Sequence, residues 1–92
     1  MGVTLKGQLI CKDEEEAALV RAALDEHISL TRAEAGCLSF HVTQSDDPLI
    51  WDVAEEFTDP AAFEAHQART KASDWGEKTK GITRMYLVKG MP

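Results

Sequence analysis

A histidine and a glutamate are the residues of this chain whose types and positions could support proton transfer. His66 follows Phe63 by three residues in a segment with helical spacing, so the two side chains share a helix face. Because imidazole titrates near neutral pH, His66 could act as a general base. Glu55 shares one face of an alternating segment with Trp51 and Phe57. A carboxylate on such an apolar face needs a partner or a raised pKa, and it could orient the histidine.

Both residues also have a structural interpretation. His66 could be a buried histidine whose ring is bonded to a strand carboxylate such as Glu55. Glu55 could instead form a salt bridge with Arg84 or another cation. The catalytic and the structural interpretation both predict that His66 and Glu55 lie close together, so their proximity alone would not separate the two.

The aromatic side chains are the expected wall of a ligand pocket, although buried rings also fill hydrophobic cores. Trp75 lies in an irregular segment, where a tryptophan often closes a pocket. Tyr86 and Arg84 share one face of the last expected strand, and either could bond a ligand oxygen. The predicted pocket residues are Phe40, Trp51, Phe57, Phe63, Trp75, Arg84 and Tyr86.

The elements that must position these residues follow the order β-α-β-β-α-β. Period-two alternation predicts strands over residues 3–12, 37–44, 49–57 and 82–89. In the second of these strands, Leu38, Phe40 and Val42 are expected to share one face. A turn at residues 45–48 makes the second and third strands an antiparallel hairpin.

Two helices are predicted, over residues 14–35 and 60–70. Asp13 and Asp59 are their expected N-caps, and Pro60 occupies the first position of the second helix. Gly36 is expected to end the first helix in a left-handed conformation. Residues 71–80 form a weaker helical or irregular segment, broken by Gly76 and Gly81. The apolar stripe expected on the first helix is Ala17, Val20, Ala23, Leu24, Ile28 and Thr31.

This order predicts an α+β, ferredoxin-like fold with both helices on one face of a four-stranded antiparallel sheet. Bulky residues fall on both faces of the later strands. An uncovered apolar sheet face is a large patch that monomers avoid, so we expect a homodimer that buries it.

Length and charge exclude several classes of protein. The 92 residues predict one domain, residues 1–92. The net charge of −6 and the absence of a basic cluster argue against nucleic-acid or anionic-membrane binding. We expect no membrane helix and no signal peptide. Cys11 and Cys37 are expected to be free thiols in the cytoplasm.

Metal and cofactor signatures are missing from the sequence. The three histidines, His27, His41 and His66, lie on different predicted elements and lack zinc-ligand spacing. Because no glycine-rich phosphate loop or dinucleotide fingerprint occurs either, we predict no metal and no bound cofactor.

Three motifs resemble the antibiotic biosynthesis monooxygenase (ABM) family, within the dimeric α+β barrel superfamily. They are Glu34-x-Gly36-Cys37-Leu38-x-Phe40, Glu55-x-Phe57-x-Asp59 and Ala62-Phe63-x-x-His66, and the resemblance extends over about residues 3–89. Many members have Tyr at the Phe40 position and Trp at the Phe57 position. The superfamily includes quinol and anthrone monooxygenases, haem-degrading enzymes and proteins without known activity, so the fold does not by itself define the reaction.

The resemblance implies a homodimer that oxidises a small quinol-like or polycyclic phenolic substrate with dioxygen and no cofactor. His66 would be the base and Glu55 would orient it. The haem-degrading members carry Asn on the first strand, where this chain has Gly7, and Trp on the second helix, where it has His66, which argues against haem degradation. The alternatives are a dimeric barrel that only binds an apolar metabolite, and an isomerase or lyase that uses the same pocket.

Overall fold

The computed structural model describes residues 2–92; Met1, which the predicted domain includes, lies outside the described residues. The elements are β1 (Val3–Ile10), α1 (Glu14–Arg32), β2 (Cys37–Gln44), β3 (Ile50–Phe57), α2 (Pro60–Ala72), α3 (Asp74–Thr79) and β4 (Thr83–Lys89). No helix among residues 2–92 has the length and apolar character needed to cross a membrane.

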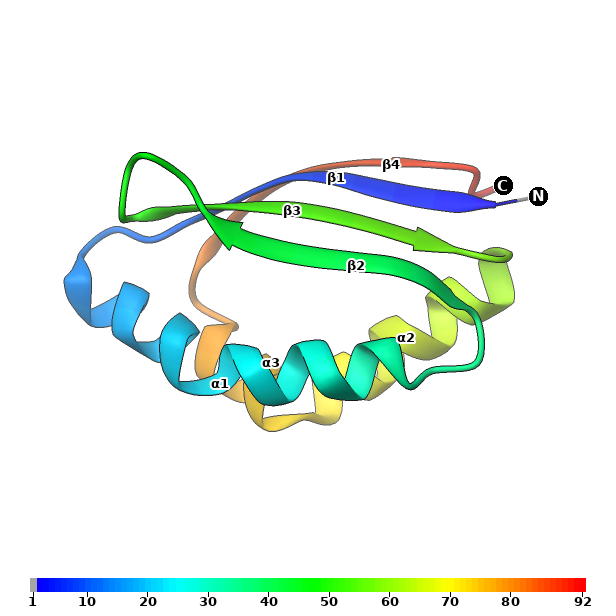
Figure 1. Cartoon of the computed structure of the whole chain (residues 1–92), viewed down its shortest axis with the longest axis horizontal. Helices are drawn as coiled ribbons and strands as arrows, with labels where there is room; N and C mark the ends of the chain where they lie inside the picture. Colours follow the sequence, from blue (N-terminus) through cyan, green and yellow to red (C-terminus); the bar gives the residue numbers. More distant parts are fainter. Residues whose placement is uncertain (1) are drawn as a thin grey trace.

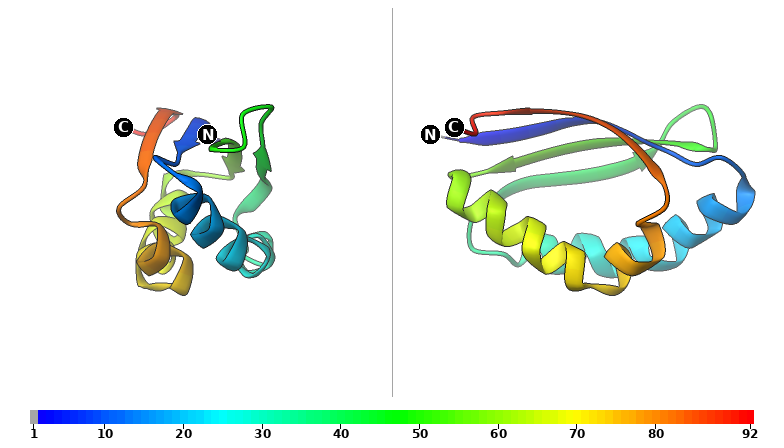
Figure 2. Two further views of the ribbon diagram at one scale, coloured as in Figure 1. Left: turned by 90° about the vertical axis from the view of Figure 1, so that its left-hand side faces the viewer. Right: turned by 180° about the vertical axis from the view of Figure 1, so that it is seen from behind.

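The four strands form one antiparallel sheet in the order β2-β3-β1-β4. Among residues 2–92 all three helices lie on the same side of this sheet, and no helix covers the other side (Figures 1 and 2). This arrangement confirms the predicted α+β, ferredoxin-like fold. Side chains from the sheet and from the helices therefore meet in one layer, where the candidate residues of the strands and the helices can come together.

The helix starts agree with the sequence prediction. Asp13 accepts a hydrogen bond from the backbone N–H of Glu16 at 3.0 Å, and Asp59 accepts one from Ala62 at 2.8 Å. Pro60 begins α2. Each cap satisfies a backbone donor that has no partner inside its helix, which fixes where α1 and α2 begin.

The predicted role of Gly36 is wrong. The first helix ends earlier than expected, at Arg32, and Gly36 does not adopt a positive φ. A Cβ atom built on Gly36 would instead lie 2.2 Å from Cβ of Ala62 on α2. Glycine is therefore required here because β2 begins in close contact with α2, not because a helix needs a left-handed end.

The predicted helix break at Gly76 is also wrong. Residues 74–79 form the short helix α3, which contains Gly76, and Ser73 caps it by accepting from the Gly76 N–H at 3.1 Å. A Cβ on Gly76 would lie 2.2 Å from the carbonyl oxygen of Thr70. The glycine thus lets α3 fold back against the end of α2, which brings Trp75 under the sheet.

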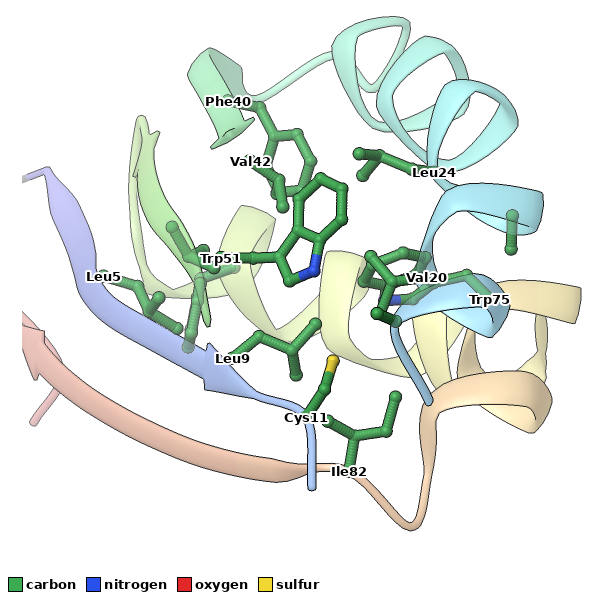
Figure 3. Close-up of a cluster of buried hydrophobic side chains, with 14 of the residues drawn as sticks. Leu5, Leu9, Cys11, Val20, Leu24, Phe40, Val42, Trp51, Trp75 and Ile82 are labelled. Carbon is green, nitrogen blue, oxygen red and sulfur yellow. The ribbon is translucent and has the colours of Figure 1, made fainter. Parts of the chain in front are cut away.

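One buried cluster fills the layer between the sheet and the helices, and Figure 3 shows part of it. On α1 the predicted apolar stripe included Ile28, but Ile28 is only half-buried, and the neighbouring His27 is buried instead. On β2 a bulge between Cys37 and Ser39 turns Leu38 outward, leaving it 58% exposed. Leu38 therefore does not share the buried face of Phe40, as the strict alternation had predicted.

The uncovered face of the sheet mixes apolar and polar side chains. Met85 and Leu87 on β4 are 65% and 62% exposed. Their partners across the ladder on β1 are Gln8 and Lys6. This face therefore carries less continuous apolar surface than the sequence pattern suggested.

Candidate functional site

The imidazole of His66 lies between two carboxylates under the sheet. Its side chain is 3% exposed, and its Nδ1 lies 2.9 Å from Oε1 of Glu34. Its Nε2 lies 3.7 Å from Oε1 of Glu55 and 3.4 Å from Oγ1 of Thr70. Because a carboxylate can only accept, the hydrogen of a neutral imidazole is assigned to Nδ1, which leaves the Nε2 lone pair facing Glu55.

The position of Glu34 is itself fixed by an arginine on α2. Arg69 donates from Nε to the second oxygen of Glu34, and from Nη2 to Oγ1 of Thr31 at 2.9 Å. The arginine thereby connects the end of α1, the segment before β2 and the last turn of α2. Because Arg69 holds Glu34 in place, Glu34 keeps the His66 ring in one orientation. In many proton-transfer sites a carboxylate orients the histidine in this way.

Burial shifts the pKa values of the two facing groups in opposite directions. Burial lowers the pKa of His66, and this outweighs the neighbouring Glu34 carboxylate, which raises it. Burial also raises the pKa of Glu55 to about 7, and the negative charge of Glu34 adds to this effect. At neutral pH the site therefore holds an uncharged imidazole beside a carboxyl group that is close to half-ionised, so it can accept one proton.

A second histidine, His27 on α1, lies close to this pair. Its ring stacks on the indole of Trp75 with centroids 4.5 Å apart and planes 1° apart, and it is 6.0 Å from the ring of His66. Burial lowers the pKa of His27 to about 3, with a smaller contribution from His66. His27 is therefore neutral at physiological pH.

The space beside His66 is small. A cavity of about 50 Å³ is bounded by both histidines, Glu55 and Trp75. This volume holds water or a diatomic molecule, whereas a cavity of about 150 Å³ is the size known to admit a benzene ring. On its other side His66 borders a wider groove of about 510 Å³ at the surface, between Gly36 and α2. An aromatic ligand can thus reach the inner side of His66 only if part of the cavity wall moves.

The structure brings most of the predicted site residues together. The predicted residues that border the cavity are His66, Glu55, Phe40, Trp75, Arg84 and Tyr86. The expected proximity of His66 and Glu55 is confirmed. Arg84 does not pair with Glu55, because its guanidinium donates to the carbonyl oxygen of Thr79 at 2.7 Å and to its Oγ1 at 2.8 Å.

Three predicted pocket aromatics lie outside the cavity wall. Trp51 belongs to the buried cluster near Leu9, its partner in the sheet. Phe57 and Phe63 pack edge to face on each other at 5.7 Å, and the ring of Phe57 also lies 4.8 Å from that of His66. Strand alternation places Trp51 and Phe57 on the buried face of β3 but away from the cavity, and Phe63 lies on α2 with its ring against Phe57.

Sequence reasoning missed two residues that contact or neighbour His66. Glu34 stood in a recognised motif, but nothing in the local sequence shows that it reaches a helix 32 residues away. His27 had a signal, since residues 20, 24, 27 and 31 fall on one helical face and are all buried. Among residues 2–92, no group of three or more metal-ligating side chains is placed to hold a metal ion.

The fold and this site define an α+β protein of the ferredoxin-like type with a histidine–carboxylate centre between sheet and helices. The chain belongs to the antibiotic biosynthesis monooxygenase (ABM) family, whose model matches residues 10–78. A comparison with proteins of curated function gives no match.

Several solved structures share the fold over nearly the whole chain. Rv0793 from Mycobacterium tuberculosis is 20% identical, with 100% of this chain and 96% of that chain covered and a TM-score of 0.77. A Nitrosomonas europaea protein provisionally named as an antibiotic biosynthesis monooxygenase is 21% identical, with 99% and 98% covered and a TM-score of 0.77. PA3566 from Pseudomonas aeruginosa is 21% identical, with 98% and 95% covered and a TM-score of 0.71. At these identities the similarity establishes the fold.

Proposed function

We propose that this protein is a monooxygenase that oxidises a small quinol-like or phenolic compound with dioxygen and without a bound cofactor. The observation that supports this proposal most is the neutral His66, held by Glu34 with its Nε2 lone pair toward the cavity. A deprotonated phenol is electron-rich enough to react with dioxygen itself. The protein then has to supply a base, an orientation and a dry site.

The reaction begins with proton transfer from the substrate hydroxyl to Nε2 of His66. The imidazolium that forms lies between Glu34 and Glu55, and it is stabilised by the charge of Glu34 and by that of Glu55 when Glu55 is ionised. The phenolate passes one electron to dioxygen, and the resulting radical pair combines at a ring carbon to give a peroxide anion. This anion takes the proton back from the His66 imidazolium and becomes a hydroperoxide. Loss of water from that hydroperoxide leaves a carbonyl, so one oxygen atom stays in the quinone product and the other leaves as water.

Substrate binding requires the cavity wall to open, and α3 is the wall element best suited to move. It is six residues long and follows directly on α2, and its Trp75 forms one side of the cavity. Displacement of Trp75 would enlarge the space beside His66 without breaking the sheet. We therefore propose that the aromatic ring of the substrate enters at the position that Trp75 now fills.

The decisive experiment measures dioxygen uptake with hydroquinone, naphthohydroquinone and anthrone, compared with buffer. We choose His66→Gln, because its side-chain amide can still donate to Glu34 but cannot act as a base near neutral pH. His41→Gln is the matched control, since His41 is exposed on β2. Enzyme-dependent uptake should disappear in the first variant and persist in the second. Uptake that survives His66→Gln rejects His66 as the base, and anaerobic turnover would favour an isomerase or lyase.

We also propose that the protein is a homodimer in the cytoplasm. The exposed Met85 and Leu87 on the uncovered sheet face support pairing of two copies through that face. The free thiols of Cys11 and Cys37 suit a reducing compartment. Light scattering on a sizing column would separate a dimer from a chain of 10.1 kDa.

A further inference from the structure

His27 is a closely packed residue with an unused polar atom. Its side chain is 4% exposed, it is stacked on Trp75, and its ring meets the edge of Phe40 at 5.2 Å. Its Nδ1 is fully buried and has no hydrogen-bond partner among residues 2–92. A buried polar atom without a partner costs about 1–3 kcal/mol, so such an atom on a residue that lines a cavity points to a missing ligand or water.

A second unused atom belongs to the same cavity. Oε1 of Glu55 is buried without a hydrogen-bond partner, and both Glu55 and His27 border the space beside His66. A hydroxyl group can donate and accept at once. It therefore satisfies His27 whichever ring nitrogen carries the hydrogen, and it satisfies Glu55 in either protonation state.

The charges around the cavity disfavour an anionic ligand. The guanidinium of Arg84 is bonded to Thr79, and that of Arg69 is bonded to Glu34 and Thr31. Burial lowers the pKa values of both histidines that border the cavity, so neither supplies a positive charge at neutral pH. A ligand carboxylate would lie beside Glu55, and the cation on the cavity wall, Arg84, is already engaged in hydrogen bonds to Thr79 and Ile82.

We propose that His27 is a substrate-anchoring residue, whose unpaired ring nitrogen binds a hydroxyl of the substrate, and that the cavity selects neutral hydroxylated arenes over aromatic carboxylates. The inference refines the proposed function, because it takes the cavity beside His66 as the substrate site. The substrate would then be held by His27 on α1 as well as by the base, His66, on α2. The proposal also predicts which aromatic compounds the protein rejects.

Binding can be tested without turnover, by NMR titration of the whole protein with phenol, toluene and benzoate under nitrogen. The informative variant is His27→Phe, which keeps a ring to stack on Trp75 but removes both nitrogens. His41→Phe, on exposed β2, is its control. The preference for phenol over toluene should fall about tenfold in His27→Phe and stay unchanged in the control. Benzoate should bind the unaltered protein at least about tenfold more weakly than phenol.

The proposal is overturned if His27→Phe keeps the full preference for phenol, if benzoate binds as tightly as phenol, or if none of the three probes binds. Should His27→Phe not fold, the ¹⁵N resonance of Nδ1 of His27 in the unaltered protein gives a second test. Phenol should shift it and toluene should not, and an equal response to both rejects the anchor. Failure of the dioxygen-uptake assay leaves these binding results unaffected, so the two proposals can fail separately.

Discussion

Removing the carboxylate of Glu34 should destabilise the protein markedly, although the Glu34 side chain is partly exposed. Glu34 is 18% exposed, and it bonds both Nδ1 of His66 and the guanidinium of Arg69. In Glu34→Ala the Nδ1–H of His66 stays buried without an acceptor, which costs about 1–3 kcal/mol. Arg69, which is 31% exposed, can turn partly to water, so its loss adds about 1 kcal/mol.

The expected total loss of stability is therefore about 3 kcal/mol, which corresponds to a fall in melting temperature of roughly 12–24 °C for a domain of this size. Urea unfolding at neutral pH measures it, provided that the slope with denaturant is unchanged. Glu34→Gln keeps an acceptor oxygen for His66, so its free energy of unfolding should fall by only about half as much as that of Glu34→Ala. Glu64→Ala, an exposed exchange on α2, is the control and should change stability by less than about 0.5 kcal/mol.

The same variant should change the titration of His66. Because the Glu34 carboxylate raises the pKa of His66 against the effect of burial, Glu34→Ala should lower this pKa further. NMR titration of the ring resonances measures the change. A loss of stability below about 1 kcal/mol, or a pKa of His66 that rises on removing Glu34, would show that Glu34 does not hold His66 as an acceptor.

Two further predictions concern Gly36 and Glu55. Gly36→Ala should lower the free energy of unfolding in urea by about 1–3 kcal/mol, because the new Cβ would lie 2.2 Å from Cβ of Ala62. Gly81→Ala is the control and should change this free energy little, because a Cβ built on Gly81 has no atom within 4 Å. Equal losses of stability in the two variants would contradict the contact between Gly36 and Ala62. Folding raises the pKa of Glu55 from 4.5 to about 7, so the folded state holds the carboxyl proton more tightly than the unfolded state. The contribution of Glu55 to stability is therefore full below pH 4.5 and declines as pH rises through 7. Glu55→Gln cannot ionise and should gain stability relative to the unaltered protein between about pH 5 and pH 8, and a constant difference across that range would disprove the raised pKa.

The fold was predictable because its signals are local. Alternation marks the strands, Asp13 and Asp59 mark the helix starts, and the βαββαβ order leaves few ways to cover the sheet. The candidate base was also predictable, since His66 shares a helix face with Phe63. Each of these inferences needs only residues that are near one another in the sequence.

Tertiary structure alone decided which partners His66 has and how much space lies beside it. Glu34 reaches His66 because Gly36 lets the start of β2 lie against α2, and no periodicity in either segment encodes that contact. The cavity is small because α3 folds back and places Trp75 on His27. Sequence determines the faces of helices and strands through steric periodicity, whereas ring stacking, ion pairing and cavity volume depend on distances between elements that are set only when the elements pack.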